Sequence, residues 1–195
     1  MAEPVRTNPL AGLALAERSV PGAEPVTLSA LPFRGKLILR GGDAIRDGAA
    51  RVLGAPLPPT MRTATAGATD LLWLGPDEWL VLTPPDRAEP TAVALREALA
   101  GLHHAVVVVG DRMTGIAIAG ARAADVLNAG CPLDLHPGAF PSGAVTRTLL
   151  GKATVVLRRP GEGGAFELWV NGSFAPYAWL FLESAAREFG IAIAA

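Results

Sequence analysis

Hydrophobic and polar positions alternate or repeat along the chain in an order that predicts an α+β fold. In the first half, residues 36–40 read Lys-Leu-Ile-Leu-Arg, a short run typical of a strand, and apolar residues recur at helical spacing soon after it. Gly75-Pro-Asp-Glu78 separates two apolar runs and predicts a hairpin. The expected elements are a strand at 36–40, a helix between Asp43 and Gly54, hairpin strands at 70–74 and 79–83, a helix from Pro90 to Gly101 and a strand buried on both faces at 105–109.

The second half repeats this order of elements. The expected elements are a strand at 114–119, a helix at 121–129, hairpin strands at 153–158 and 165–170, a long helix that begins near Ser173 and an apolar end at 191–194. We therefore predict two tandem βαββαβ units, each a ferredoxin-like layer of helices on a sheet. The alternative is one irregular α+β domain whose halves are similar by chance.

The predicted division has an N-terminal arm, two units and one inserted loop. The arm is placed at 1–30, where scattered prolines disfavour a long regular element, the first unit at 31–110 and the second at 111–195. The apolar patch at 10–16 is a poor signal peptide because acidic residues flank it. The second unit carries an insertion at 131–143, and function is expected near this asymmetry.

Composition narrows the classes of function. The 17 Lys and Arg residues nearly balance the 18 Asp and Glu residues. The net charge therefore does not indicate a protein that binds nucleic acid. Half of the residues are hydrophobic, and a buried interface with a partner would account for this excess. No apolar run approaches the ~20 residues that a membrane helix needs. One cysteine excludes an intrachain disulfide, so we expect a cytoplasmic protein.

The usual signatures of catalysis are missing from the sequence. Gly151-Lys-Ala lacks the flanking residues of a phosphate-binding loop, and no serine stands in a nucleophile elbow. Cys131 and His136 are too few to close a zinc site. Cys131 is interpreted as a small buried hydrophobe at a helix end, with an activated thiolate as the alternative. His136 is interpreted as a loop residue that bonds the backbone, with a general base as the alternative.

Several residues are candidates for contact with a partner. The loop 131–143 is rigid and partly apolar, and tryptophans often concentrate binding energy at interfaces. Trp73 and Trp79 could instead pack in the core, and Asp111 with Arg112 could form only a weak ion pair at a strand end. The candidate interface residues are Asp111, Arg112, Leu135, His136, Phe140, Trp73 and Trp79.

Four motifs carry a resemblance to a known family. They are Leu74-Gly-Pro-Asp-Glu-Trp-Leu80, Asp111-Arg-Met-Thr-Gly115, Gly130-Cys-Pro-Leu-Asp-Leu-His-Pro137 with Phe140-Pro141, and Ser173-Phe-Ala-Pro-Tyr-Ala-Trp179. In this order they resemble the gamma subunit of bacterial heterotetrameric sarcosine oxidase, over about residues 31–190. That family looks like a relative of the aminomethyltransferase, folate-binding fold.

The resemblance implies a complex of alpha, beta, gamma and delta chains that oxidatively demethylates sarcosine to glycine. FAD, FMN and NAD are expected in the alpha and beta chains, zinc in the delta chain, and tetrahydrofolate as the one-carbon acceptor in a domain of alpha. The gamma chain is expected to hold none of these cofactors and to be inactive by itself.

One departure from the aminomethyltransferases supports a structural role. Those enzymes place a catalytic Asp on the strand that matches residues 151–157, where this chain reads Gly-Lys-Ala-Thr-Val-Val-Leu. Without a carboxylate there, one-carbon transfer would lack its acid-base group. The alternative is a free-standing folate-binding protein of the aminomethyltransferase type. The related iron-sulfur assembly proteins do not fit, because their Lys-Gly-Cys-Tyr-x-Gly-Gln signature is missing.

Overall fold

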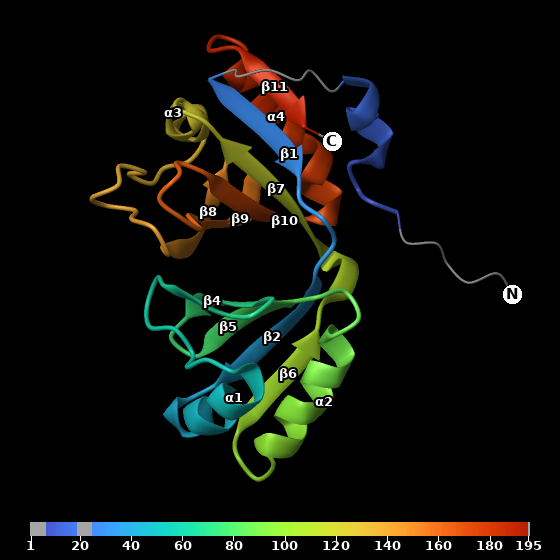
Figure 1. Ribbon diagram of the computed structural model, residues 1–195, viewed down its shortest axis with the longest axis vertical. Coiled ribbons are helices and arrows are strands. Elements are labelled where there is room, and N and C mark those ends of the chain that lie inside the picture. The colour runs from blue at the N-terminus through green and yellow to red at the C-terminus, as the bar shows by residue number, and fades with distance from the viewer. Residues whose placement is uncertain (1–6, 19–24, 195) are drawn as a thin grey trace, which may run out of the picture.

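The chain forms two helix-covered β-sheets that stack along the long axis of the molecule (Figure 1). The computed structural model describes residues 7–18 and 25–194. Apart from one additional strand in each half, its elements follow the predicted order of strand, helix, hairpin, helix and strand. The predicted α+β class with two ferredoxin-like units is confirmed.

The first sheet is built from a contiguous stretch of chain. Its strands are β2 (Gly35–Gly41), β3 (Thr63–Ala66), β4 (Thr69–Gly75), β5 (Glu78–Thr83) and β6 (His104–Val108), in the spatial order β3-β4-β5-β2-β6. All of its pairs are antiparallel. Helices α1 (Arg46–Leu53) and α2 (Ala88–Ala98) pack on one face, around Leu37, Leu39 and Trp79. Gly54 adopts a left-handed conformation (φ 78°) that ends α1.

The second sheet has the order β11-β1-β7-β10-β9-β8. Its elements from the second half are β7 (Met113–Ala119), α3 (Ala123–Asn128), β8 (Val145–Leu150), β9 (Ala153–Arg158), β10 (Phe166–Asn171), α4 (Ala175–Ala186) and β11 (Ile191–Ala194). Helices α3 and α4 contribute Val126, Trp179 and Leu182 to the core on one face of this sheet. Short 3-10 turns occur in both units. They are η3 (Asp43–Ile45) before α1, η4 (Gly110–Arg112) before β7 and η5 (Gly172–Phe174) before α4.

The N-terminal part of the chain supplies a strand to this second sheet, which corrects the prediction of an arm at 1–30. Strand β1 (Val26–Ala30) runs parallel to β11 and antiparallel to β7, and so lies between them. Val26 and Leu28 are fully buried and alternate with partly exposed Thr27 and Ser29. This alternation is short and follows several prolines, so its strand pattern is weak in the sequence.

The described part of the expected arm also packs on the second unit. Leu10 is 1% exposed and belongs to the core beneath α4, just before the 3-10 turns η1 (Ala11–Leu13) and η2 (Leu15–Arg18). Gly120 allows the chain before β1 to approach closely, because a Cβ atom there would lie 2.2 Å from the carbonyl oxygen of Pro25. Residues 1–6 and 19–24 of the expected arm lie outside the described residues.

Edge strands differ from the sequence prediction in two respects. Each unit has an extra strand, β3 or β8, that the sequence analysis did not predict. Strand β6 was predicted to be buried on both faces, but it is the last strand of its sheet and Val107 is 52% exposed. The prediction for β6 was wrong because an apolar run reveals hydrophobicity, not the number of layers that cover it.

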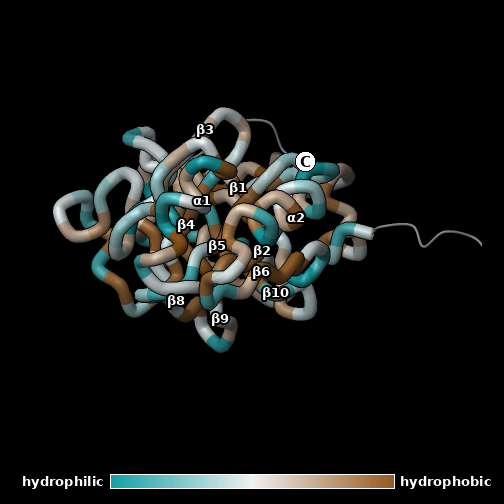
Figure 2. The backbone as a smooth tube through the Cα atoms, turned by 90° about the horizontal axis from the view of Figure 1, so that it is seen from below, coloured by the Kyte–Doolittle hydropathy of each residue, from teal (hydrophilic) through white to brown (hydrophobic). Residues whose placement is uncertain are grey.

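The two sheets face each other across an apolar layer between the units. This layer, the inter-sheet core, contains no helix residue and consists of Leu72, Leu74, Leu80, Leu82, Val145, Val156 and Trp169. Figure 2 shows hydrophobic segments running through the middle of the molecule, around β2, β5 and β6. The sheets are also linked by their backbones, since Val145 N donates to Met61 O (3.1 Å) and Thr63 N donates to Gly143 O (2.9 Å).

Candidate functional site

The inserted loop 131–143 turns its apolar side chains inward. Leu135 and Phe140 are 1% and 2% exposed and belong to the core of the second unit. The Phe140 ring stacks on Phe166 with centroids 6.4 Å apart, and its carbonyl accepts a hydrogen bond from Arg159 (3.1 Å). This packing changes the expectation for both residues, because their side chains fill the chain's own core and do not face solvent.

His136 is the exposed candidate in this loop. Its backbone N–H donates to Asp134 Oδ1 (2.9 Å), and its Nδ1 accepts a hydrogen bond from Gly138 N (3.1 Å). These are the local loop bonds that the sequence analysis expected. Cys131, at the start of the loop, is 6% exposed with its Sγ atom 3.8 Å from Thr148 Oγ1, as expected for a small buried residue.

The two candidate tryptophans pack within the protein. Trp79 is fully buried under α1, donates from Nε1 to Pro58 O (3.1 Å), and has the Arg46 guanidinium 5.3 Å from its ring. Trp73 is half-buried and packs against both the first unit's core and the inter-sheet core. For Trp79 the structure therefore favours the core-packing interpretation over a role as an interface anchor.

Asp111 and Arg112 lie in η4, which joins the two units. Both are exposed, but they border different cavities. Asp111 lines a pocket of about 210 Å³ beside Lys36, which we call the Lys36 pocket. Arg112 lines a cleft of about 120 Å³ between the two sheets, which we call the inter-sheet cleft.

The Lys36 pocket surrounds an almost fully buried ammonium group. Lys36 is 1% exposed, and its Nζ donates to the carbonyl oxygens of Arg34 (2.8 Å) and Gly110 (3.1 Å). The Phe33 and Trp169 rings lie 4.2 and 5.6 Å from this cation. Lys36 thus ties the link between β1 and β2 to the start of η4.

The inter-sheet cleft lies between the inner faces of the two sheets. Its apolar wall comes from both sheets and includes Ile38, Leu74, Met113 and Val156. Glu78 of β5 and Arg147 of β8 form an ion pair across it. Arg112 makes no side-chain hydrogen bond or ion pair with any residue that the structure describes.

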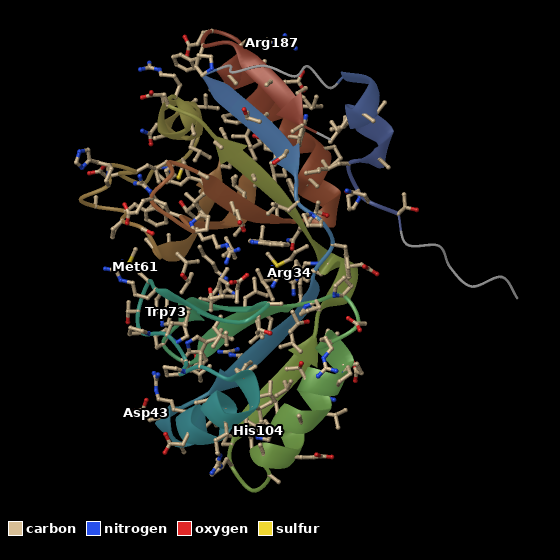
Figure 3. All side chains as sticks on the ribbon, in the orientation of Figure 1. Arg34, Asp43, Met61, Trp73, His104 and Arg187 are labelled. Carbon is tan, nitrogen blue, oxygen red and sulfur yellow. The ribbon has the colours of Figure 1, made fainter. Side chains whose placement is uncertain are left out.

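At the opposite end of the same strands, the sheets are joined by buried charges. We call Arg34, Asp70, Arg158 and Glu167 the charged network. Asp70 Oδ2 lies 3.1 Å from Arg34 and 3.4 Å from Arg158, and Arg158 lies 2.7 Å from Glu167. Arg34, which lies where the units meet (Figure 3), also donates to the backbone of Leu82 (3.0 Å). The four side chains are 9–23% exposed.

The pattern of residues along the chain does not indicate Lys36 or the charged network as parts of a site. Lys36 occupies alternate strand positions with Ile38 and Arg40, so the pattern correctly assigns these three residues to one face. Nothing in that pattern reveals that a second sheet covers part of this face. Among residues 7–18 and 25–194, no group of three or more His, Cys, Asp or Glu side chains could hold a metal ion. No described helix is long and apolar enough to cross a membrane.

Comparison with known proteins places the chain in a family. The family model described as the sarcosine oxidase gamma subunit family matches residues 41–188. The chain belongs to this family. The sarcosine oxidase subunit gamma of an Arthrobacter species is 34% identical over 153 residues, which are 76% of this chain and 73% of the relative. The sarcosine oxidase subunit gamma of Corynebacterium sp. strain U-96 is 31% identical over 194 residues, which are 96% of this chain and 93% of the relative.

Solved structures agree with this family assignment. A chain of the heterotetrameric sarcosine oxidase from Corynebacterium sp. U-96, in complex with pyrrole 2-carboxylate, matches with a TM-score of 0.85 and 30% identity. The match covers 97% of this chain and 99% of that chain. The glycine cleavage system aminomethyltransferase T from Bartonella henselae matches with a TM-score of 0.65 and 16% identity over 95% of this chain and 51% of that one. The latter likeness shows a shared fold, and it confirms the predicted aminomethyltransferase-like fold.

Proposed function

We propose that this chain is the gamma subunit of a heterotetrameric, flavin-dependent sarcosine oxidase and serves it as a non-catalytic structural subunit. The complex would oxidatively demethylate sarcosine to glycine, with tetrahydrofolate as the one-carbon acceptor. The observation that carries this proposal is the end-to-end match to one chain of a solved heterotetrameric sarcosine oxidase, which covers 97% of this chain.

The composition of β9 supports a structural role. Residues 151–157, where the aminomethyltransferases place a catalytic carboxylate, contain none in this chain. Ala153, Val155 and Leu157 are at most 1% exposed and point into the core beneath the helices. Removing a proton from an amine needs a basic group within hydrogen-bond reach, and these side chains supply none.

The cofactors of the reaction would then belong to the other chains. FAD, FMN, NAD, zinc and tetrahydrofolate are expected in the alpha, beta and delta subunits. The alternative of a free-standing folate-binding protein is not favoured, because the aminomethyltransferase likeness rests on 16% identity and 51% of that enzyme. The oxidase chain matches at nearly twice that identity and over its full length.

Native isolation from the source cell tests the proposed function. A tag would follow Ala195 through a flexible linker, and the mass, absorption spectrum and sarcosine-dependent formation of glycine would be measured on what is recovered. We expect a complex with three other chains, a flavin spectrum and activity, whereas the purified chain alone should be inactive and bind no folate. Recovery of a colourless monomer that binds folate would contradict the proposal.

A further inference from the structure

We propose that the inter-sheet cleft, together with the exposed face of β6 beside it, binds an apolar segment of another subunit of the oxidase, and that a carboxylate of this segment pairs with Arg112. This inference rests on the proposed function, since it needs a partner chain. It adds the surface at which that partner docks.

The first support is the position of exposed apolar side chains. Val107 and Leu149 are 52% and 47% exposed, and both belong to strands. In the β-sheet registers, Val107 lies opposite Ile38 and Leu149 lies opposite Thr154. Residues opposite each other in antiparallel strands point to the same face. Because Ile38 and Thr154 line the inter-sheet cleft, the two exposed residues extend its apolar surface on both sides.

The second support is the size of the cleft. Its volume is about 120 Å³, and its lining includes the apolar residues Ile38, Leu74 and Val156. An apolar protein cavity of ~150 Å³ binds benzene, so a cleft of similar size can hold one aliphatic or aromatic side chain. An apolar side chain from a partner would fill this space between the two sheets.

The third support is charge. Glu78 and Arg147 neutralise each other across the inter-sheet cleft, and Arg40 pairs with Asp77 nearby. Arg112 has no such partner among the described residues, so the border of the cleft carries one uncompensated positive charge. Burying an arginine at an interface is costly unless an acidic group pairs with it. The occupant should therefore bring a carboxylate.

The fourth support is the edge of the first sheet. Strand β6 is its last strand, and residues 104–108 read His-Ala-Val-Val-Val, without lysine or proline. Arg96 of α2 donates to one carbonyl of this strand, that of Val106 (3.1 Å). Natural proteins protect such edges with charges, prolines or a covering segment, because an apolar edge strand otherwise promotes association. An edge with these properties fits a protein partner better than a small molecule.

Native isolation of tagged variants tests this surface. Val107→Asp would place a charge on the exposed face of β6, and Arg112→Glu would reverse the charge at the cleft. We expect each to lower the yield of heterotetramer roughly tenfold or more, as the loss of a central contact residue does. The matched controls are Val93→Asp and Arg87→Glu, exposed positions in and just before α2, on the far side of the same sheet. Both should assemble as wild type does.

A second measurement does not depend on substitutions. Hydrogen exchange would compare the amides of β6 and residues 109–113 in the wild-type complex and in the isolated chain. We expect slower exchange in the complex at these amides and no change in α2.

The outcomes separate this inference from the proposed function. If wild-type chain is recovered in no complex, the proposed function fails. If wild-type chain assembles and both Val107→Asp and Arg112→Glu assemble equally well, or if β6 gains no protection, the docking surface is refuted. Self-association of the isolated chain that Val107→Asp abolishes would instead identify a second copy as the occupant, and would also overturn the inference.

Discussion

The two ends of the inter-sheet core differ in how far the chain's own side chains cover them. At one end, the charged network of Arg34, Asp70, Arg158 and Glu167 joins the sheets with side chains that are 9–23% exposed. At the other end, the inter-sheet cleft separates the sheets, and Arg147 of the ion pair across it is 44% exposed. The first end is closed by groups within the chain, whereas the second leaves apolar surface uncovered.

This difference indicates that the closed end stabilises the chain and that the open end is available for assembly. Charges that are largely buried and mutually paired fix the orientation of the units, because removing Asp70 takes the carboxylate from Arg34, and removing Arg158 takes the guanidinium from Glu167, in a poorly solvated place. Uncovered apolar surface adds nothing to the stability of the isolated chain and becomes useful only when a partner buries it. We therefore expect substitutions at the closed end to change folding and those at the open end to change assembly.

The largest effect is expected from breaking the charged network. Asp70→Ala should lower the free energy of unfolding by about 3–4 kcal/mol, because Arg34 loses its carboxylate partner and Arg158 keeps only Glu167. Urea unfolding of the isolated chain measures this. Asp77→Ala removes the ion-pair partner of Arg40. Because Asp77 is 52% exposed, this substitution should lower the free energy of unfolding by less than about 1 kcal/mol. Equal losses in the two variants would show that the network is no more important than a surface pair.

A smaller difference is expected between two leucines of the inter-sheet core. Leu82 is fully buried near the charged network, whereas Leu74 lines the inter-sheet cleft. Leu82→Ala should lower the free energy of unfolding by about 3–4 kcal/mol. Leu74→Ala should lower it by only about 2 kcal/mol, because water can enter the space that it leaves at the open end. The same unfolding titration compares them. A larger loss for Leu74→Ala would mean that the open end is as tightly closed as the other.

The ion pair across the cleft should contribute little to the stability of the chain. A double-mutant cycle with Glu78→Gln and Arg147→Gln should give a coupling energy of about 0.5–1 kcal/mol, because Arg147 is 44% exposed and water weakens the attraction. The cycle is measured by unfolding at low and high salt, and the coupling should fall as salt rises. A coupling above about 3 kcal/mol would place this pair in the same class as the charged network.

The smallest effect on stability is expected at the exposed face of β6. Val107→Thr keeps the β-branched shape at a position that is 52% exposed, so the free energy of unfolding should change by less than about 0.5 kcal/mol. Thermal unfolding of the isolated chain checks this, with Val106→Thr as a buried comparison that should cost more, since Val106 is 8% exposed. Equal costs would show that Val107 is already covered in the free chain.

Local patterns predicted most elements because each depends on residues close in sequence. The hairpin of β4 and β5 follows from its apolar runs and the turn at Gly75-Pro-Asp-Glu78, and the end of α1 follows from Gly54. Strand β1 was missed because its partners, β7 and β11, lie far along the chain. A short alternation such as Val26 to Ala30 becomes a strand only when distant strands supply its hydrogen bonds.

The candidate site shows the same limit. The sequence correctly indicated that Leu135 and Phe140 are apolar and that the loop around them is constrained by prolines. Whether an apolar loop contacts a partner or its own domain depends on neighbours such as Phe166, which only the folded chain brings near. Arg112 was identified as a candidate contact residue from sequence, but its place beside a cleft depends on how the two sheets pack.

The sequence by itself determined the order of elements, the duplicated α+β design and the resemblance to the gamma subunits. Those conclusions depend on local periodicity and on short motifs, which are properties of neighbouring residues. The tertiary structure decided which faces are covered: it buried Lys36 and Arg158, placed β1 inside the second sheet and left Val107 exposed. Burial depends on contacts between segments far apart in the chain, and no local pattern of hydrophobic and polar residues specifies those contacts.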